Sequence, residues 1–279
     1  MNLAIDAGGT NYRAEILDND QSVQTLCVKS ADIGLSNWIE TILNEYHGIK
    51  TVYIAYAGQV KEGVIISAPN QNVDNHDIKN YFEDKFGVEL FIENDLNCAV
   101  LAEAEHFNCE NICALYVGTG LGLGVVSSSK LICGHNGVTT EIGHIPYKDA
   151  PFRCGCGKSN CLELFASGSG VMKFKEYNSI DSSKRLTELQ ESKNAVEKKL
   201  YDEFETALVH AVGTVITLFT PEILVLGGGI ISADEELIQR ITSRVKDFAM
   251  PITLQGVKIV QTQMQNAPLR GALLLKDCR

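Results

Sequence analysis

The sequence has no excess of basic residues, and this lack excludes one broad class of function. Among its 279 residues, 24 lysines and arginines stand against 35 aspartates and glutamates, which gives a formal net charge of −11. A protein that binds nucleic acid needs a basic face to displace counterions from phosphates. We therefore expect no nucleic-acid partner. Small anionic ligands are still allowed, because a glycine turn or a metal ion can hold phosphate on an acidic protein.

The sequence also lacks a targeting segment and a clear membrane span. Its first ten residues, MNLAIDAGGT, have no basic start and no long apolar run, so we expect no secretory signal. The longest weakly charged stretch, residues 209–231, is long enough to cross a bilayer. Because it contains Pro221, Glu222 and three consecutive glycines, we interpret it as a buried helix followed by a buried strand. We expect no membrane partner.

Paired cysteines are not evident either. The chain has nine cysteines, an odd number, and most stand singly among apolar neighbours. Free cysteines of this kind behave as small buried hydrophobic residues, and their scatter favours a reducing cytoplasm over a disulfide framework. Only Cys154, Cys156 and Cys161 are clustered, and in a cytoplasmic protein such a cluster predicts a metal site.

Strand-like runs alternate with helical patterns along the whole chain, and this alternation predicts an α/β fold. Residues 2–5 and 14–17 flank a Gly-Gly turn and predict a β-hairpin. Residues 112–117 and 123–127 flank a second glycine turn, so the opening arrangement is repeated. We predict two related lobes, each opened by a hairpin whose tip carries glycines and a threonine.

Periodicity and punctuation predict the remaining elements. Helices are predicted at residues 37–46 and 97–107 and in a long apolar stripe that ends before Pro221. Strands are predicted at residues 51–56, 64–67, 89–92 and 223–226. The polar segment 176–199 predicts a helix that faces solvent. No change in composition marks a linker, and we place the lobes at residues 1–108 and 109–266, with a C-terminal helix at 267–279 packing back on the first lobe.

Three glycine-rich turns follow apolar strands, at residues 6–10, 118–122 and 227–229. Glycine lets backbone N–H groups approach an anion closely, and threonine adds a hydroxyl donor, so such turns can hold phosphates. The alternative interpretation is that each is simply a turn. Two rival nucleotide motifs are excluded. Phe152 stands where a P-loop ending at Gly157-Lys158-Ser159 would need glycine, and no G-x-G-x-x-G follows a strand.

The run Glu93-Asn94-Asp95 lies between a predicted strand and a predicted helix. In one interpretation Asn94 or Asp95 only caps the helix. In the other, a carboxylate held at the end of a strand acts as a general base toward a substrate hydroxyl, and Asn94 hydrogen-bonds a polyol. The residues alone leave both open.

The strongest local signal is H-x9-C-x-C-x4-C, formed by His144, Cys154, Cys156 and Cys161. One imidazole and three thiolates make the closed tetrahedral set that structural zinc prefers. A loop folded around that ion would also bring Glu141 and Glu163 to one place, an arrangement suited to binding hydroxyls.

In this order and spacing, the motifs resemble those of the ROK (repressor, open reading frame, kinase) family of sugar kinases. The resemblance runs nearly the whole chain and implies a two-lobed, actin-like or hexokinase-like ATPase fold. Its anchors are Asp6-Ala7-Gly8-Gly9-Thr10, Glu93-Asn94-Asp95-x-Asn97, Gly118-Thr119-Gly120-x-Gly122, Glu141-Ile142-Gly143-His144, Cys154-Gly155-Cys156-Gly157 with Cys161-Leu162-Glu163, and Leu226-Gly227-Gly228-Gly229.

The resemblance also implies roles for individual residues. It makes Asp95 the catalytic base and places Asp6 near magnesium and phosphate. It implies that ATP is bound by Gly8, Gly9, Thr10, Gly118, Thr119, Gly120, Gly227 and Gly228. It implies that the sugar is bound by Asn70, Asn94, Asp95, Glu141, His144 and Glu163, and that structural zinc is bound by His144, Cys154, Cys156 and Cys161.

The implied reaction is the transfer of a phosphoryl group from ATP to the 6-hydroxyl of a hexose. Glucose is the first expectation, followed by N-acetylglucosamine, N-acetylmannosamine and fructose, and the resemblance implies a homodimer. The alternative is a silent sugar sensor of the same family, which we disfavour because Asp95 is present and only five residues precede Asp6. The sequence departs from the family pattern at two places: Ala57-Gly58 stands where the family usually has Pro-Gly, and Thr139-Thr140 stands where it usually has Ala-Gly. These departures leave the identity of the sugar open.

Overall fold

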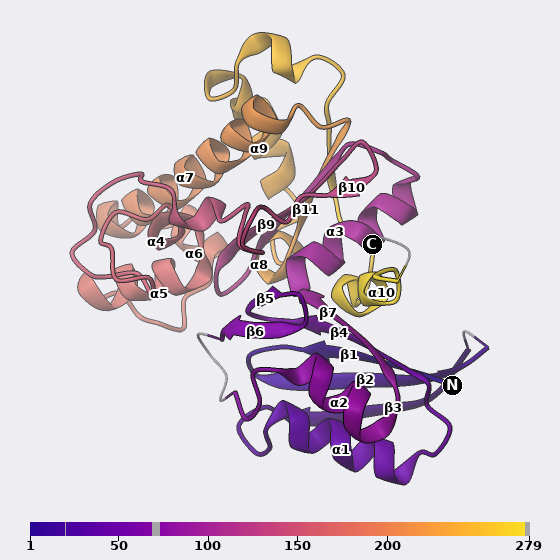
Figure 1. The fold of residues 1–279 in the computed structure, drawn as a ribbon. Helices are drawn as coiled ribbons and strands as arrows, with labels where there is room; N and C mark the ends of the chain where they lie inside the picture. The colour runs from indigo at the N-terminus through magenta and orange to yellow at the C-terminus, as the bar shows by residue number, and fades with distance from the viewer. Residues whose placement is uncertain (20, 69–72, 277–279) are drawn as a thin grey trace. The chain divides into compact units, whose positions relative to one another are not determined.

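The computed structural model describes residues 1–19, 21–68 and 73–276 (Figure 1). The described residues form two compact units. Unit 1 contains those within 1–110, 124–139 and 264–279, and unit 2 contains those within 111–123 and 140–263.

Unit 1 is built on a five-stranded sheet with the order β3-β2-β1-β4-β7. β1 (Asn2–Ala7) and β2 (Asn11–Asp18) form the predicted antiparallel hairpin, which β3 (Gln21–Lys29) extends. β1, β4 (Thr51–Tyr56) and β7 (Glu89–Asn94) are parallel. Every residue of β4 is buried, as expected for a central strand between parallel neighbours.

The helices of unit 1 arise from apolar stripes that pack on this sheet. The core combines Ile39 and Ile42 of α1 with Ile54 and Tyr56 of β4 and Phe82 of α2. Burying each of these side chains stabilises the fold by about 1.5–3 kcal/mol. The remaining elements are α1 (Leu35–Glu45), the two-stranded sheet of β5 (Gln59–Lys61) and β6 (Val64–Ser67), α2 (Ile78–Phe86), α3 (Asp95–Phe107), β10 (Lys130–Leu131) and α10 (Ala267–Ala272).

The short helix α10 packs closely on α3 (Figure 1). A Cβ atom at Gly271 would lie only 1.6 Å from the carbonyl oxygen of Cys98. Any side chain at position 271 would therefore force the two helices apart, so glycine is required here.

The second sheet has the order β10-β9-β8-β11-β12. Its strands β8 (Ile112–Val117), β11 (Ile223–Gly227) and β12 (Lys258–Gln261) are parallel, and β9 (Leu121–Ser127) adjoins β8. When β8, β9, β10, β11 and β12 are matched to β1, β2, β3, β4 and β7, the two sheets have the same strand order. The predicted duplication is therefore confirmed.

Unit 2 carries its longest helix, α7 (Ala195–Phe219), where the apolar stripe predicts one. The helix ends at Thr220, whose φ of 43° is left-handed, immediately before Pro221. No helix in the described ranges has the length and hydropathy needed to cross a membrane. The other helices are η1 (Ile142–His144), α4 (Glu163–Ala166), α5 (Gly168–Tyr177), α6 (Leu186–Gln190), α8 (Gly229–Ser232), α9 (Leu237–Arg244), η2 (Val245–Asp247) and η3 (Pro251–Leu254).

The prediction of one helix over residues 176–199 is wrong. The segment instead contains the end of α5, the short α6 and the start of α7. Local side-chain hydrogen bonds interrupt it: Asp181 accepts from the N–H and hydroxyl of Ser183, and Asn194 caps α7 through the N–H of Val196. Short polar side chains of this kind compete with helical hydrogen bonding.

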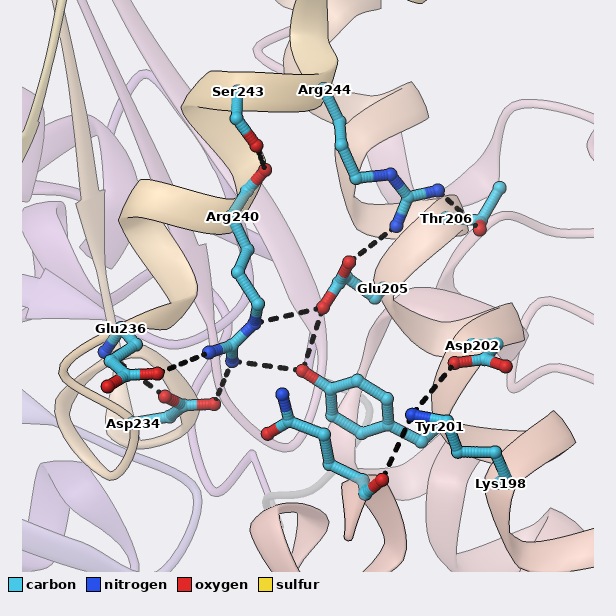
Figure 2. Close-up of polar contacts among 11 residues, drawn as sticks. Lys198, Tyr201, Asp202, Glu205, Thr206, Asp234, Glu236, Arg240, Ser243 and Arg244 are labelled. Atoms are coloured by element: carbon cyan, nitrogen blue, oxygen red, sulfur yellow. Dashed lines mark hydrogen bonds and ion pairs between the residues drawn. The ribbon is translucent and has the colours of Figure 1, made fainter.

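A buried polar network fastens α9 to α7 in unit 2 (Figure 2). The guanidinium of Arg240 donates to the Glu205 carboxylate over 3.1 Å and to the Tyr201 hydroxyl over 2.9 Å. It also pairs with Asp234, just beyond α8, while Arg244 pairs with the other oxygen of Glu205. The network therefore fixes the chain that follows the third glycine turn against the central helix of the unit.

Candidate active site

In unit 1, the predicted catalytic and phosphate-binding residues follow the carboxyl ends of three adjacent parallel strands. Ala7, Tyr56 and Asn94 are in register across β1, β4 and β7. The glycine turn at 8–10, Ala57-Gly58 and Asp95 come directly after these positions. The carboxyl edge of a parallel sheet is where ligands bind in open α/β folds, so the topology brings these residues to one edge.

Asn94 and Asp95 have distinct positions at the start of α3. The Asn94 Oδ1 accepts from the N–H groups of Leu96 and Asn97 at 2.9 and 3.2 Å, and its Nδ2 donates to the carbonyl of Gly58 at 3.0 Å. Asn94 is thus the helix cap. Asp95 is the first residue of α3, where the helix dipole favours a negative carboxylate.

Asp6 lies near the end of β1 with 16% of its side chain exposed. Burial raises the pKa of the Asp6 carboxyl, and the guanidinium of Arg13, 3.7 Å away, opposes that rise. The turn that follows is closed by the N–H of Gly8 donating to the carbonyl of Asn11. Ser30 also holds this turn: its hydroxyl donates to the carbonyl of Gly9 at 2.7 Å, and its backbone N–H donates to the carbonyl of Thr10 at 3.0 Å.

In unit 2, the other two glycine turns also follow neighbouring parallel strands. Gly227 at the end of β11 is in register with Tyr116 of β8. Gly228 has a φ of 92°, and a Cβ there would lie 2.4 Å from the carbonyl oxygen of Val117. The close approach of the two strand ends therefore requires glycine at 228 and places the turn at 227–228 beside the turn at 118–120.

The turn at 118–120 is held by the segment that contains Glu163. The N–H groups of Gly168 and Ser169, at the start of α5, donate to the carbonyls of Gly118 and Thr119 at 2.8 and 3.0 Å. Neither residue is among those predicted from the sequence. The signal that could have found them is the Ser-Gly-Ser-Gly run at 167–170, which is itself a fourth small-residue turn.

The four predicted metal ligands come together. The ligand atoms of His144, Cys154, Cys156 and Cys161 all lie within 4.8 Å of one another. The loop is closed by the N–H of Cys154 donating to the carbonyl of Lys158 and by Gly157, whose φ is 90°. A set of one imidazole and three thiols at this spacing fits a tetrahedral zinc ion.

The protonation of the thiols also bears on metal binding. Burial raises the pKa of the Cys161 thiol to about 12 and also raises that of Cys154, whereas the backbone N–H of Lys158 lowers that of Cys156. A bound cation would therefore displace protons from Cys154 and Cys161 as it forms bonds to sulfur.

The predicted sugar-binding groups of unit 2 surround this loop. His144 directs Nδ1 toward the Cys154 sulfur, 3.6 Å away, and Nε2 toward Glu141, whose carboxylate oxygen lies at 3.9 Å. Glu163 lies between the thiol loop and the glycine turn, with one oxygen 3.6 Å from the Cys154 sulfur and the other 3.1 Å from the N–H of Leu121. Asn70, also predicted to bind sugar, lies outside the described residues.

The departure at Thr139-Thr140 has a local structural consequence. Thr140 has a φ of 59°, in the left-handed region where glycine is favoured. Its hydroxyl donates to the carbonyl of Leu123 at 2.6 Å. A non-glycine residue in this conformation costs roughly 1–3 kcal/mol, and the side-chain hydrogen bond offsets part of that cost.

Comparison with solved structures identifies the fold. A ROK hexokinase from Thermus thermophilus has the same fold, with a TM-score of 0.79 and 25% identity over 99% of both chains. The predicted fold class, the actin-like or hexokinase-like ATPase fold, is thereby confirmed. The chain therefore has the fold of a hexokinase.

The sequence comparisons name the family. A glucokinase from Thermotoga maritima is 28% identical over 302 residues, which cover 97% of this chain and 95% of that protein. An N-acetyl-D-glucosamine kinase from Pectobacterium carotovorum is 34% identical over 203 residues, 67% of this chain and 66% of that protein. The ROK family matches residues 2–278. The chain belongs to the ROK family and is a sugar kinase, and transcriptional repressors are also among its relatives.

Proposed function

We propose that the protein is an ATP-dependent hexokinase that phosphorylates glucose at its 6-hydroxyl, in the cytoplasm. The observation that carries this proposal is the position of Asp95, the first residue of α3 directly after a parallel strand. The likeness to a glucokinase over nearly the full length of both chains supports glucose as the substrate. N-acetylglucosamine is the second candidate, because the N-acetylglucosamine kinase relative has the higher identity over a shorter stretch.

In this mechanism Asp95 accepts the proton of the sugar 6-hydroxyl. The resulting oxygen attacks the γ-phosphorus of ATP, the bond from that phosphorus to the β-phosphate oxygen breaks, and ADP leaves. The helix dipole at the start of α3 favours the negative form of the carboxylate that takes the proton. In phosphoryl transfer the protein mainly positions the reacting groups and stabilises charge. The main task of such a base is therefore to orient the nucleophile.

The proposal assigns ATP to the glycine turns. In unit 2, Gly118, Thr119 and Gly120 would hold phosphates through backbone N–H groups, and Gly227 and Gly228 would lie against the adenosine. In unit 1, Gly8, Gly9 and Thr10 would also contact phosphate. Mg²⁺, held near Asp6, would neutralise charge on the transferred group when bound.

The proposal assigns the hydroxyls of the sugar to Asn70, Asn94, Glu141, His144 and Glu163. Because the Asn94 Oδ1 already accepts two N–H groups, its contribution would come from the one remaining hydrogen on Nδ2. A zinc ion on His144 Nδ1 and the three cysteines would fix the tautomer that presents Nε2 beside Glu141.

The test is the release of ADP from ATP and Mg²⁺ with glucose, mannose, fructose, N-acetylglucosamine and N-acetylmannosamine. We expect glucose to stimulate turnover most strongly, and NMR of the product to place phosphate on the 6-hydroxyl. Strong preference for another sugar would overturn the assignment of glucose as the substrate. Sugar binding without any ADP release would favour the silent sensor instead.

A further inference from the structure

A cavity in unit 2 adjoins the loop that carries the predicted metal ligands, and none of the residues of the three glycine turns lines it. Its volume is about 390 Å³, within the size range of small-molecule sites. The segment at 148–151, α4, α5 and the first turns of α7 form its walls. Its apolar lining consists of Pro151, Phe165, Phe174, Tyr177, Val196 and Leu200.

Two apolar side chains at the rim of this cavity are exposed to solvent. Tyr177 is 65% exposed and Val196 is 48% exposed. Phe174 is half-buried and meets the ring of Phe165 at 5.3 Å. Aromatic walls of this kind favour a planar, apolar group that can stack on them.

Four charged residues also line the cavity, and they fall into two kinds. Lys148 and Glu203 satisfy each other in an ion pair of 2.5 Å. The side chains of Lys199 and Asp149, both exposed, have no hydrogen bond or ion pair within the part of the chain that the structure describes. The cavity therefore has one cation and one anion available to a ligand and no net charge.

We propose that this cavity binds a zwitterionic aromatic molecule of amino-acid size. Its ring would lie among Phe165, Phe174 and Tyr177, its carboxylate would pair with Lys199, and its ammonium group would pair with Asp149. A ligand of this class uses both unpaired charges and covers the apolar rim, which neither a simple hydrocarbon nor a simple anion does.

The cavity also connects to the sugar-binding loop, which gives its ligand a regulatory role. Phe165 lies two residues after Glu163, and its ring meets Tyr147 at 5.3 Å. The N–H of Tyr147 in turn donates to the carbonyl of Asn160, next to Cys161. A ligand that repositions Phe165 would change the affinity for sugar. This regulatory role rests on the proposed function, whereas the binding itself does not.

The first test measures binding by calorimetry with phenylalanine, 3-phenylpropanoate, which lacks the ammonium group, and phenethylamine, which lacks the carboxylate. We expect phenylalanine to bind at least fivefold more tightly than either analogue. Lys199→Met should make phenylalanine and phenethylamine bind alike, and Asp149→Asn should make phenylalanine and 3-phenylpropanoate bind alike. Lys193→Met, a change of an exposed lysine outside the cavity, should leave all three affinities unchanged.

A second variant distinguishes the cavity from other sites. Val196→Phe fills the rim from an exposed position and should abolish phenylalanine binding without unfolding the protein. The proposal is overturned if the wild-type protein binds none of the three probes at millimolar concentration, or if Val196→Phe binds phenylalanine normally. It is also overturned if Val196→Phe breaks an oligomer in light scattering, because a second copy of the chain would then cover this face.

Steady-state kinetics test the regulatory role. Phenylalanine should change the KM for sugar at least twofold in the wild-type protein and leave it unchanged in Val196→Phe. Binding without any change in KM would overturn the regulatory role and leave the site in place. An inactive protein that still binds phenylalanine would count against the proposed kinase function alone.

Discussion

One carboxylate oxygen of Glu163 accepts the backbone N–H of Leu121 at 3.1 Å. Leu121 follows the glycine turn at 118–120, and Glu163 follows the last cysteine of the thiol loop. This hydrogen bond therefore ties the turn proposed to hold phosphate to the loop proposed to hold zinc and sugar. It gives Glu163 a positioning role in addition to its proposed contact with a sugar hydroxyl.

Gly120→Ala tests this contact. A Cβ at position 120 would lie 2.7 Å from the Glu163 carboxylate, whereas a Cβ at Gly118 would meet no atom within 4 Å. Because this Glu163 oxygen is the far end of a flexible side chain, Glu163 can move aside and lose its hydrogen bond to Leu121. We expect Gly120→Ala to lower stability by about 0.5–1.5 kcal/mol, the contribution of that hydrogen bond, and to raise the KM for both substrates. Gly118→Ala is the control for stability alone, because Gly118 is itself proposed to hold phosphate, and equal melting temperatures for the two variants would contradict the prediction.

Asp95→Asn tests the general base. We expect kcat to fall by roughly 10²- to 10⁴-fold, the usual contribution of acid–base catalysis, because an amide cannot accept the proton. The affinity for sugar, measured by calorimetry, should stay close to that of the wild type. Asp84→Asn, on the exposed face of α2, serves as the control. Full turnover in Asp95→Asn would exclude the role.

Cys156→Ser tests the metal centre. The wild-type protein should contain one zinc ion per chain by elemental analysis, and the variant should contain far less. Because the loop carries His144 and lies against Glu163, activity should fall by at least roughly 10- to 100-fold. Cys27→Ser, an exposed cysteine on β3, should change neither quantity. Wild-type protein free of zinc, yet fully active, would remove the basis of this prediction.

Arg240→Met tests the network that joins α9 to α7. The substitution leaves the Asp234 carboxylate, 11% exposed, without its cation, and leaves the Glu205 carboxylate, 9% exposed, with Arg244 as its remaining cation. Breaking one partner of such a buried set costs about 3–5 kcal/mol, which denaturant unfolding would measure. Lys198→Met removes the exposed pair with Asp202 at 3.6 Å and one hydrogen bond to the Gln190 carbonyl at 3.0 Å (Figure 2), and should cost no more than about 1–2 kcal/mol. Equal losses in the two variants would contradict this assignment.

Glu205 should also make stability depend on pH. Burial alone would raise the pKa of its carboxyl, but hydrogen bonds from Tyr201, Arg244 and Arg240 together hold it below the ordinary value of 4.5. A lowered pKa contributes stability that is present above pH 4.5 and is lost as the pH falls through the folded value.

Glu205→Gln isolates this contribution. Stability measured by denaturant unfolding should be lower in the variant at pH 7, and the gap should narrow as the pH falls below about 4.5. Parallel curves for the two proteins across this range would show that Glu205 is not the group responsible.

Several features of the site followed from the sequence because they depend on local chemistry. The hairpins at both lobes, the strands at 51–56 and 223–226 and the clustering of the four predicted metal ligands appear where spacing and periodicity predict them. The segment at 176–199 was predicted incorrectly because its polar side chains hydrogen-bond the nearby backbone, and polarity alone does not distinguish a solvated helix from such turns.

The sequence by itself determined the glycine turns, the ligand spacing from His144 to Cys161 and the alternation of strands and helices, because each depends on residues close together in the chain. Only the tertiary structure decided that Asn94 bonds to Gly58, that Glu163 reaches Leu121, and that Arg240 joins Glu205. These partners are 35 to 42 residues apart, and their meeting depends on how whole elements pack, which no local pattern specifies.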